Sequence, residues 1–285
     1  MNMEFKRKLP TPQTIKDMYP ISEELAQKKQ ANDRQIRAIL TGEDDRLLLL
    51  IGPCSADRED AVLDYAVRLR TLQDRVADKL LIVPRIYSNK PRTTGDGYKG
   101  MLHQPNPNGQ PDLLNGLIAI RKMHMKVLEQ TGFSSADELL YPENYYYLSD
   151  ILSYAAIGAR SVEDQQHRLI ASGLDVPVGM KNPTSGDLTV MMNSIQAAQH
   201  AHTFLFSQWE VHSKGNPLAH AILRGSTNKF GRSLPNYHYE DLNQLCELYA
   251  KSGLQNPGVI IDTNHANSAK HWDQQPRIAK EVLHS

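Results

Sequence analysis

The stretch LLLLIG at residues 47–52 predicts the first buried strand of the chain. A continuous apolar run that ends at Gly-Pro predicts a strand buried on both of its faces. The residues after it, CSAD (54–57), put a cysteine and an aspartate just past the end of that strand. Apolar side chains at helical spacing follow from Val62 to Val76, so this part of the chain predicts a strand, a loop and a helix.

The same unit recurs along the chain and indicates the architecture. A long polar stretch at 88–111 interrupts the pattern where we expect a functional loop, and residues 202–218 predict an additional β-hairpin. Such units occur in a (β/α)8 barrel or a doubly wound sheet, and no Gly-rich dinucleotide fingerprint follows the first strand. Further strands are expected at 80–87, 137–140, 156–160, 177–182, 220–225 and 258–265.

Chemically reactive side chains fall at the ends of these expected strands, and this placement favours the barrel. In a barrel the carboxyl ends of all strands converge on one face, which carries the active site. We therefore predict an α/β fold of the TIM type over residues 46–285. The extension at 1–45 is either a solvated arm or an arm that packs on another subunit. The residues at the strand ends are Cys54, Arg85, Glu138, Arg160, Lys181, Arg224 and His265.

The composition limits the partners of the chain. Lys+Arg and Asp+Glu both number 32, so no net field favours nucleic acid or an anionic membrane. No apolar run reaches the ~20 residues of a membrane-spanning helix, and the N-terminus lacks the apolar core of a signal peptide. The two cysteines, Cys54 and Cys246, form no disulfide framework, so we expect a cytoplasmic protein.

Cations gather at or near the expected strand ends, which indicates anionic ligands. A concentration of positive charge destabilises an empty site, and guanidinium and ammonium groups are the usual partners of phosphate and carboxylate. The number of cations suits two phosphates and one carboxylate. The segment KPRTT (90–94) adds two hydroxyl donors, and Arg160 precedes a helix that we expect to begin at Ser161. The cations are Arg85, Lys90, Arg92, Arg160, Lys181 and Arg224.

Three residues have open interpretations. Cys54 is a soft metal ligand once deprotonated and His265 could share a metal with it, but each could instead be structural. Glu138 could relay a proton or be the charge partner of a cation. Asp262 and Asn264 lie close to His265 in the sequence and could orient its ring.

Six ordered blocks carry a resemblance: IGPCSAD (51–57), PRIYSNKPRTTGDGYKG (84–100), AIGARSVEDQQHR (156–168), PVGMKNPTSG (177–186), ILRG (222–225) and IDTNHANS (261–268). Together they closely resemble the class I, metal-dependent 3-deoxy-7-phosphoheptulonate (DAHP) synthases. The resemblance implies a barrel enzyme at the entry to the shikimate pathway, which condenses phosphoenolpyruvate with erythrose 4-phosphate. It also implies a divalent metal (Mn, Fe, Co or Zn) and a homo-oligomer.

The resemblance implies roles for individual residues. Lys90, Glu138 and His265 would be catalytic, with Glu138 near the reacting carbon and its water. Cys54 and His265 match two metal ligands, and the metal would polarise the aldehyde as a Lewis acid. Phosphoenolpyruvate would be bound by Arg85, Lys90, Ala159, Arg160, Lys181 and Arg224, and erythrose 4-phosphate by Lys90, Pro91, Arg92 and Thr93.

The count of strands leaves the expected barrel one unit short. The family's other two metal ligands are a Glu on the eighth strand and an Asp beyond it, and neither has a counterpart before Ser285. We therefore expect an incomplete metal site and weak activity. The alternative function is a catalytically impaired remnant that binds phosphorylated ligands or full-length subunits.

The choice of sugar phosphate and of effector also follows from the resemblance. The related 3-deoxy-octulosonate-8-phosphate synthases take another sugar phosphate, but KPRTT (90–94) and the N-terminal extension favour the DAHP synthases. Members of the family respond to Phe, Tyr or Trp. The segment YPENYYYL (141–148) lies near where some of them bind such effectors, so we expect an aromatic amino acid effector.

Overall fold

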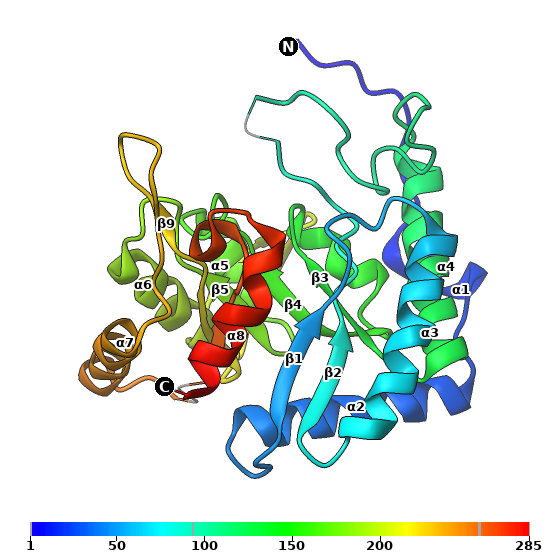
Figure 1. The fold of residues 1–285 in the computed structure, drawn as a ribbon. Coiled ribbons are helices and arrows are strands. Elements are labelled where there is room, and N and C mark those ends of the chain that lie inside the picture. The colour runs from blue at the N-terminus through cyan, green and yellow to red at the C-terminus, as the bar shows by residue number, and fades with distance from the viewer. Residues whose placement is uncertain (1, 93, 256–257, 285) are drawn as a thin grey trace. The chain divides into compact units, whose positions relative to one another are not determined.

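The computed structural model describes residues 2–92, 94–255 and 258–284 (Figure 1). The chain forms two compact units, the first comprising Met1–Ile39 and Asp44–Ser153 and the second Leu40–Glu43 and Tyr154–Ser285. None of the helices in the described ranges is long and apolar enough to cross a membrane.

The strands of the first unit are parallel. β1 (Leu47–Ile51) pairs with β2 (Leu80–Pro84) along its whole length. Just past β2, Arg85 forms a parallel bridge with Ala136 of β3 (Ser135–Glu138), and the Ile86 amide donates to the Ala136 carbonyl at 2.8 Å. The carboxyl ends of these strands therefore point the same way within the unit.

Helices cover the strands of the first unit. α3 (Glu59–Val76) packs on α4 (Leu113–Thr131) and on β2, and the three lie side by side in Figure 1. α4 ends at Gly132, which takes a left-handed φ of 72°. The other helices of this unit are α1 (Pro12–Met18), α2 (Glu23–Leu40) and the 3-10 helix η1 (Pro142–Tyr147).

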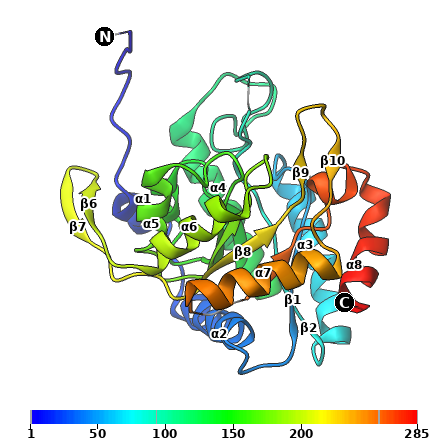
Figure 2. The same ribbon diagram turned by 90° about the vertical axis from the view of Figure 1, so that its left-hand side faces the viewer.

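The second unit holds a parallel sheet in the order β4-β5-β8-β11, with most of β4 in this unit. The strands are β4 (Leu152–Ile157), β5 (Val178–Lys181), β8 (Ala219–Leu223) and β11 (Val259–Ile261). The helix α6 packs on β5 and β8 (Figure 2). The helices are α5 (Gln165–Ala171), α6 (Leu188–Gln199), α7 (Tyr239–Ser252), α8 (Gln275–His284), η2 (His265–Ser268) and η3 (Trp272–Gln274).

Two antiparallel hairpins complete the second unit. The predicted hairpin within 202–218 is confirmed as β6 (Thr203–Phe206) and β7 (Trp209–His212). The smaller pair, β9 (Ser226–Thr227) and β10 (Ser233–Leu234), was not predicted from the sequence. Both hairpins project from the ribbon in Figure 2.

The α/β class with parallel strands is confirmed, but some predicted boundaries are wrong. The third strand, predicted at 137–140, ends at Glu138. The fourth strand, predicted at 156–160, ends at Ile157, because its fully buried segment begins already at Leu152. The helix expected from Ser161 begins at Gln165. Asp164 caps it by accepting from the His167 amide, and Ser161 lies instead in a turn.

Candidate active site

The predicted reactive residues lie at or shortly after the carboxyl ends of their strands. Glu138 and Lys181 are the last residues of β3 and β5, and Arg85 and Arg224 directly follow β2 and β8. Cys54, Arg160 and His265 lie a few residues beyond β1, β4 and β11. The expected strand at 258–265 stops earlier, at Ile261, so His265 begins the 3-10 helix η2 instead of ending a strand.

In the first unit, Lys90 and Cys54 are in direct contact. The Lys90 ammonium donates to the Cys54 carbonyl and lies 3.5 Å from the Cys54 Sγ. Burial lowers the pKa of Lys90 and the positive charge of Arg85 lowers it further, whereas Cys54 and Glu138 act to raise it. A lysine with a lowered pKa can exchange a proton more readily than a solvated one.

Arg85 is fixed beside these residues by contacts from two sides. Its guanidinium donates to the Pro53 carbonyl at 2.9 Å and stacks over the Tyr87 ring, with Cζ 3.9 Å from the ring centroid. The chain before Cys54 approaches Arg85 so closely that a Cβ on Gly52 would lie 2.0 Å from the Arg85 carbonyl oxygen. Only glycine can occupy that position without moving the backbone.

Glu138 is buried at the end of β3, and its neighbour Asp137 forms a network that the sequence did not suggest. The Asp137 carboxylate accepts from the Ser88 amide at 2.9 Å, from the Ser88 hydroxyl, and from the Glu138 amide at 2.7 Å. The detectable signal was a second carboxylate inside a short, otherwise uncharged strand, directly before Glu138.

The segment expected to bind erythrose 4-phosphate lies in the long loop after β2. The loop is closed by a bond from the Lys90 amide to the Lys99 carbonyl at 3.0 Å. Arg92 is exposed and its Nε donates to the Tyr98 carbonyl at 2.8 Å, while Pro91 is half-buried. Thr93, also predicted for this role, lies outside the described residues.

The second unit joins three of the predicted residues in one group. The Asp262 carboxylate is bound by the His265 Nδ1 at 2.7 Å and by the Asn264 amide at 3.0 Å. Burial acts to raise the pKa of Asp262, but the bond and charge of His265 and the charge of Lys181 outweigh it and lower the pKa to about 2. His265 has a left-handed φ of 46°, and the bond to Asp262 helps to hold this unusual backbone.

Arg224 and the loop after β4 supply the other predicted cations of the second unit. Arg224 is buried, and its amide donates to the Asn182 side chain at 2.9 Å. Arg160 is exposed and Ala159 half-buried, both in the turn before α5. Because α5 begins at Gln165, the expectation that a helix begins directly after Arg160 is wrong.

The described residues do not by themselves fit a complete divalent-metal site. Among them, no group of three or more His, Cys, Asp or Glu side chains is arranged to hold an ion. Cys54 belongs to the first unit and His265 to the second, where the bond from Nδ1 to Asp262 leaves Nε2 as the nitrogen for a metal.

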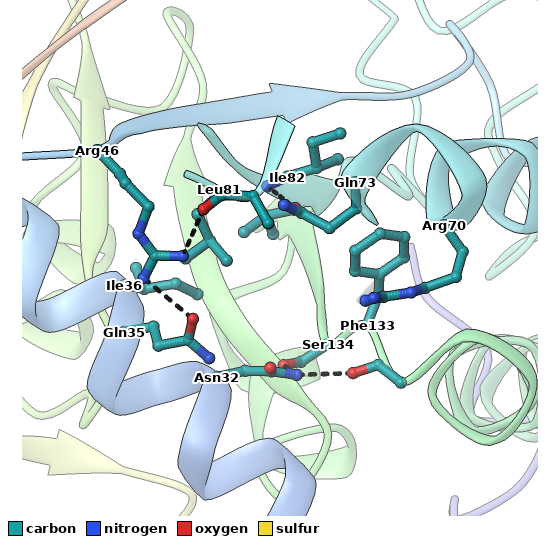
Figure 3. Close-up of a pocket in the computed structure, with 13 residues that line it drawn as sticks. Asn32, Gln35, Ile36, Arg46, Arg70, Gln73, Leu81, Ile82, Phe133 and Ser134 are labelled. Atoms are coloured by element: carbon teal, nitrogen blue, oxygen red, sulfur yellow. Dashed lines mark hydrogen bonds between the residues drawn. The ribbon is translucent and has the colours of Figure 1, made fainter. Parts of the chain in front are cut away.

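A cavity of about 180 Å³ in the first unit lies at the opposite ends of the strands (Figure 3). It is lined by Arg46, which precedes β1, and Ser134, which precedes β3. Two bonds join polar side chains of its lining: Arg46 reaches the Gln35 Oε1 at 3.1 Å and Asn32 the Ser134 Oγ at 2.7 Å. These bonds join α2 to the starts of the strands, which is a structural role.

Comparison with known proteins adds independent findings. The sequence profile of the DAHP synthetase I family matches residues 19–285. The Tyr-sensitive phospho-2-dehydro-3-deoxyheptonate aldolase of Escherichia coli (strain K12) is 38% identical over 282 residues, 96% of this chain and 76% of that protein. The Phe-sensitive enzyme of the same strain is 38% identical over 284 residues, 98% of this chain and 78% of that protein.

A solved structure is similar throughout the chain. The phospho-2-dehydro-3-deoxyheptonate aldolase of Francisella tularensis SCHU S4 superposes with a TM-score of 0.92 at 29% sequence identity, covering 99% of this chain and 82% of that one. The similarity therefore extends over all the strand ends described above.

Proposed function

The chain belongs to the DAHP synthetase I family, and we infer that it acts as a 3-deoxy-7-phosphoheptulonate synthase of aromatic amino acid biosynthesis. It condenses phosphoenolpyruvate with erythrose 4-phosphate and water to give DAHP and phosphate. The observation that carries this function is the family match over residues 19–285, which includes every strand end that presents a reactive side chain.

The condensation requires the binding of two anionic substrates and two proton transfers. The enol carbon of phosphoenolpyruvate bonds to the aldehyde carbon, water adds to C2, and phosphate leaves with cleavage of its C–O bond. We assign Lys90 to protonate the aldehyde oxygen, which its lowered pKa supports, and Glu138 to take the proton of the attacking water. Phosphoenolpyruvate is assigned to Arg85 and Lys90 in the first unit and to Ala159, Arg160, Lys181 and Arg224 in the second.

Erythrose 4-phosphate is assigned to the segment from Lys90 to Thr93, and a divalent metal to Cys54 and His265. A bound metal would supply Lewis acidity toward the aldehyde. We also propose a cytoplasmic homo-oligomer. Relatives named as Tyr-, Phe- and Trp-sensitive support an aromatic amino acid effector, which inhibition by each of the three amino acids would identify.

The function is tested by following loss of the phosphoenolpyruvate absorbance when residues 1–285 are mixed with phosphoenolpyruvate, erythrose 4-phosphate and Mn²⁺. We expect turnover that requires erythrose 4-phosphate and that Lys90→Met abolishes. Arabinose 5-phosphate in its place tests the 3-deoxy-octulosonate-8-phosphate alternative. A preference for that sugar would contradict the assignment.

A second candidate is a protein that binds phosphorylated ligands without turning them over. It is favoured by one observation, the lack of a three-donor metal group among the described residues. Calorimetric binding of phosphoenolpyruvate, with no DAHP formed at any Mn²⁺ concentration, would support this candidate over the enzyme.

A further inference from the structure

Asp137 is a buried carboxyl that the reaction described above does not use. Its side chain is only 1% exposed, so it cannot itself touch a substrate. It lies on β3 directly before Glu138, and all its hydrogen-bond donors are neutral groups. Burying a carboxyl among neutral groups disfavours its charged form. The carboxyl of Asp137 is therefore a candidate for a functional role.

The carboxylate of Asp137 joins the two segments that carry the proposed proton-transfer residues. One oxygen accepts from the Ser88 amide and from the Glu138 amide, and the other accepts from the Ser88 hydroxyl. Lys90 follows Ser88 by two residues, across the buried Asn89. The carboxyl of Asp137 therefore contributes directly to the position of Lys90 relative to Glu138.

Contacts other than the bonds to Asp137 also restrict the segment at Ser88. The Ser88 carbonyl accepts from the Leu102 amide at 3.3 Å. Gly100 approaches so closely that a Cβ there would lie 2.4 Å from the Ser88 carbonyl oxygen. A change in the bonds at Asp137 would therefore be passed along the chain to Lys90 instead of being absorbed locally.

No cation among the described contacts compensates Asp137. On α4, His124 places its Nε2 3.9 Å from Asp137 Oδ2, while its Nδ1 is paired with the Ser135 hydroxyl at 2.6 Å. Burial lowers the pKa of His124 to about 3, so the ring is neutral at pH 7. Glu138 on the same strand has the same sign of charge, and Ser88 is uncharged. Burial therefore raises the pKa of Asp137 to about 7, against the opposing effect of its hydrogen bonds.

We propose that Asp137 is a positioning residue. Its ionised carboxylate holds Lys90 and Glu138 in position relative to each other, and protonation of this carboxylate weakens the hydrogen bonds that do so. This inference rests on the proposed function. Bonds from N–H and O–H donors to a carboxylate are shorter and stronger than those to a neutral acid. A proton on Oδ2 also turns an acceptor into a donor, so the Ser88 hydroxyl has to turn away.

Asp137→Asn imitates the protonated acid with nearly the same shape. We expect kcat of the variant to be about tenfold lower at pH 8, with KM changed much less. The wild-type kcat should fall toward the variant value as the pH drops below about 7, whereas the variant should lack this limb. A variant that keeps the wild-type pH profile, whatever its absolute rate, would overturn the proposal.

A second readout does not depend on turnover. Because the Lys90 ammonium lies 3.5 Å from the Cys54 sulfur, the rate at which iodoacetamide alkylates Cys54 reports on the position of Lys90. Peptide mass spectrometry separates Cys54 from Cys246. We expect the ratio of the variant rate to the wild-type rate to differ from one by several-fold at pH 8 and to approach one at pH 6. A ratio of one at both pH values contradicts the proposal even if the proposed function itself fails.

Two serine variants show whether the effect belongs to this network. Ser88→Ala removes the hydroxyl donor but keeps the amide bond, so it should shift the alkylation ratio in the same direction by a smaller amount. Ser153→Ala is the matched control, a buried serine whose hydroxyl has no hydrogen-bond partner among the described residues. If the control changes the ratio as much as Ser88→Ala does, the effect is not specific and the proposal fails.

Discussion

Asp137 in the first unit and Asp262 in the second are two largely buried carboxyls with opposite properties. Their side chains are 1% and 18% exposed. Burial raises the pKa of Asp137 to about 7, whereas the pKa of Asp262 falls to about 2 in spite of burial. The difference lies in their partners, because Asp262 faces His265 and Lys181 and Asp137 faces neutral donors and another carboxyl.

Burial alone therefore does not determine whether a carboxyl is charged. Loss of water penalises both anions and hydrogen bonds oppose this penalty in both, but only at Asp262 do the bond and charge of His265 and the charge of Lys181 outweigh it. Asp262 is therefore a constant negative charge near neutral pH, suited to hold His265 in one orientation. Asp137 can change its charge near neutral pH, which suits a residue whose protonation alters the position of its neighbours.

The largest effect is expected from removing the charge of Asp262. Asp262→Asn removes the carboxylate that faces His265 and Lys181 in a mostly buried site. Removing one partner of such a pair lowers the free energy of unfolding by about 3 kcal/mol. Urea denaturation at pH 7 measures the change in free energy of unfolding. The exposed Asp273→Asn serves as the control and should change it by less than about 0.5 kcal/mol. A loss below about 1 kcal/mol for Asp262→Asn would remove the contrast between the two carboxyls.

Asp137→Asn should change the free energy of unfolding in the opposite direction and stabilise the protein. A raised folded-state pKa means that ionisation opposes folding, so the wild type loses stability as the pH rises from the ordinary carboxyl range through about 7. The amide cannot ionise, and we expect the variant to be more stable than the wild type by about 1–3 kcal/mol at pH 8.

The advantage of Asp137→Asn should shrink toward pH 4, where the wild-type carboxyl is protonated in the folded chain and half-protonated in the unfolded one. Thermal unfolding of both proteins at several pH values between 4 and 8 measures this trend. An advantage that is constant with pH would mean that Asp137 does not titrate in this range.

The smallest change is expected from Ser88→Ala. It removes one of the donors to Asp137 and should lower the free energy of unfolding by about 1–2 kcal/mol at pH 8, where the carboxylate is charged. The cost should be smaller at pH 5, because a hydrogen bond to the neutral acid is weaker. Thermal unfolding at the two pH values tests this, and an equal cost at both would contradict it.

Much of the candidate site could be predicted because it follows strand ends. A buried strand such as Leu47–Ile51 has an apolar pattern that sequence displays directly, and the reactive residue after it is then placed by topology. The sequence does not display a strand boundary directly where apolar and polar residues mix. The fourth strand was placed too late because Leu152 and Ser153, both fully buried, follow the polar start of the segment at Ser149 and Asp150.

The α/β class, the succession of strands along the chain and the residues at their ends could all be predicted from the sequence, because hydrophobic periodicity and motif spacing are local properties of the chain. Only the tertiary structure decided the charge of individual groups. Asp137 and Asp262 are the same residue type near the ends of similar strands, yet one has a pKa of about 7 and the other a pKa of about 2. The difference arises from what folding places around each carboxyl: full burial beside Glu138 for Asp137, and for Asp262 the turn that brings His265 onto the carboxylate, with Lys181 close by.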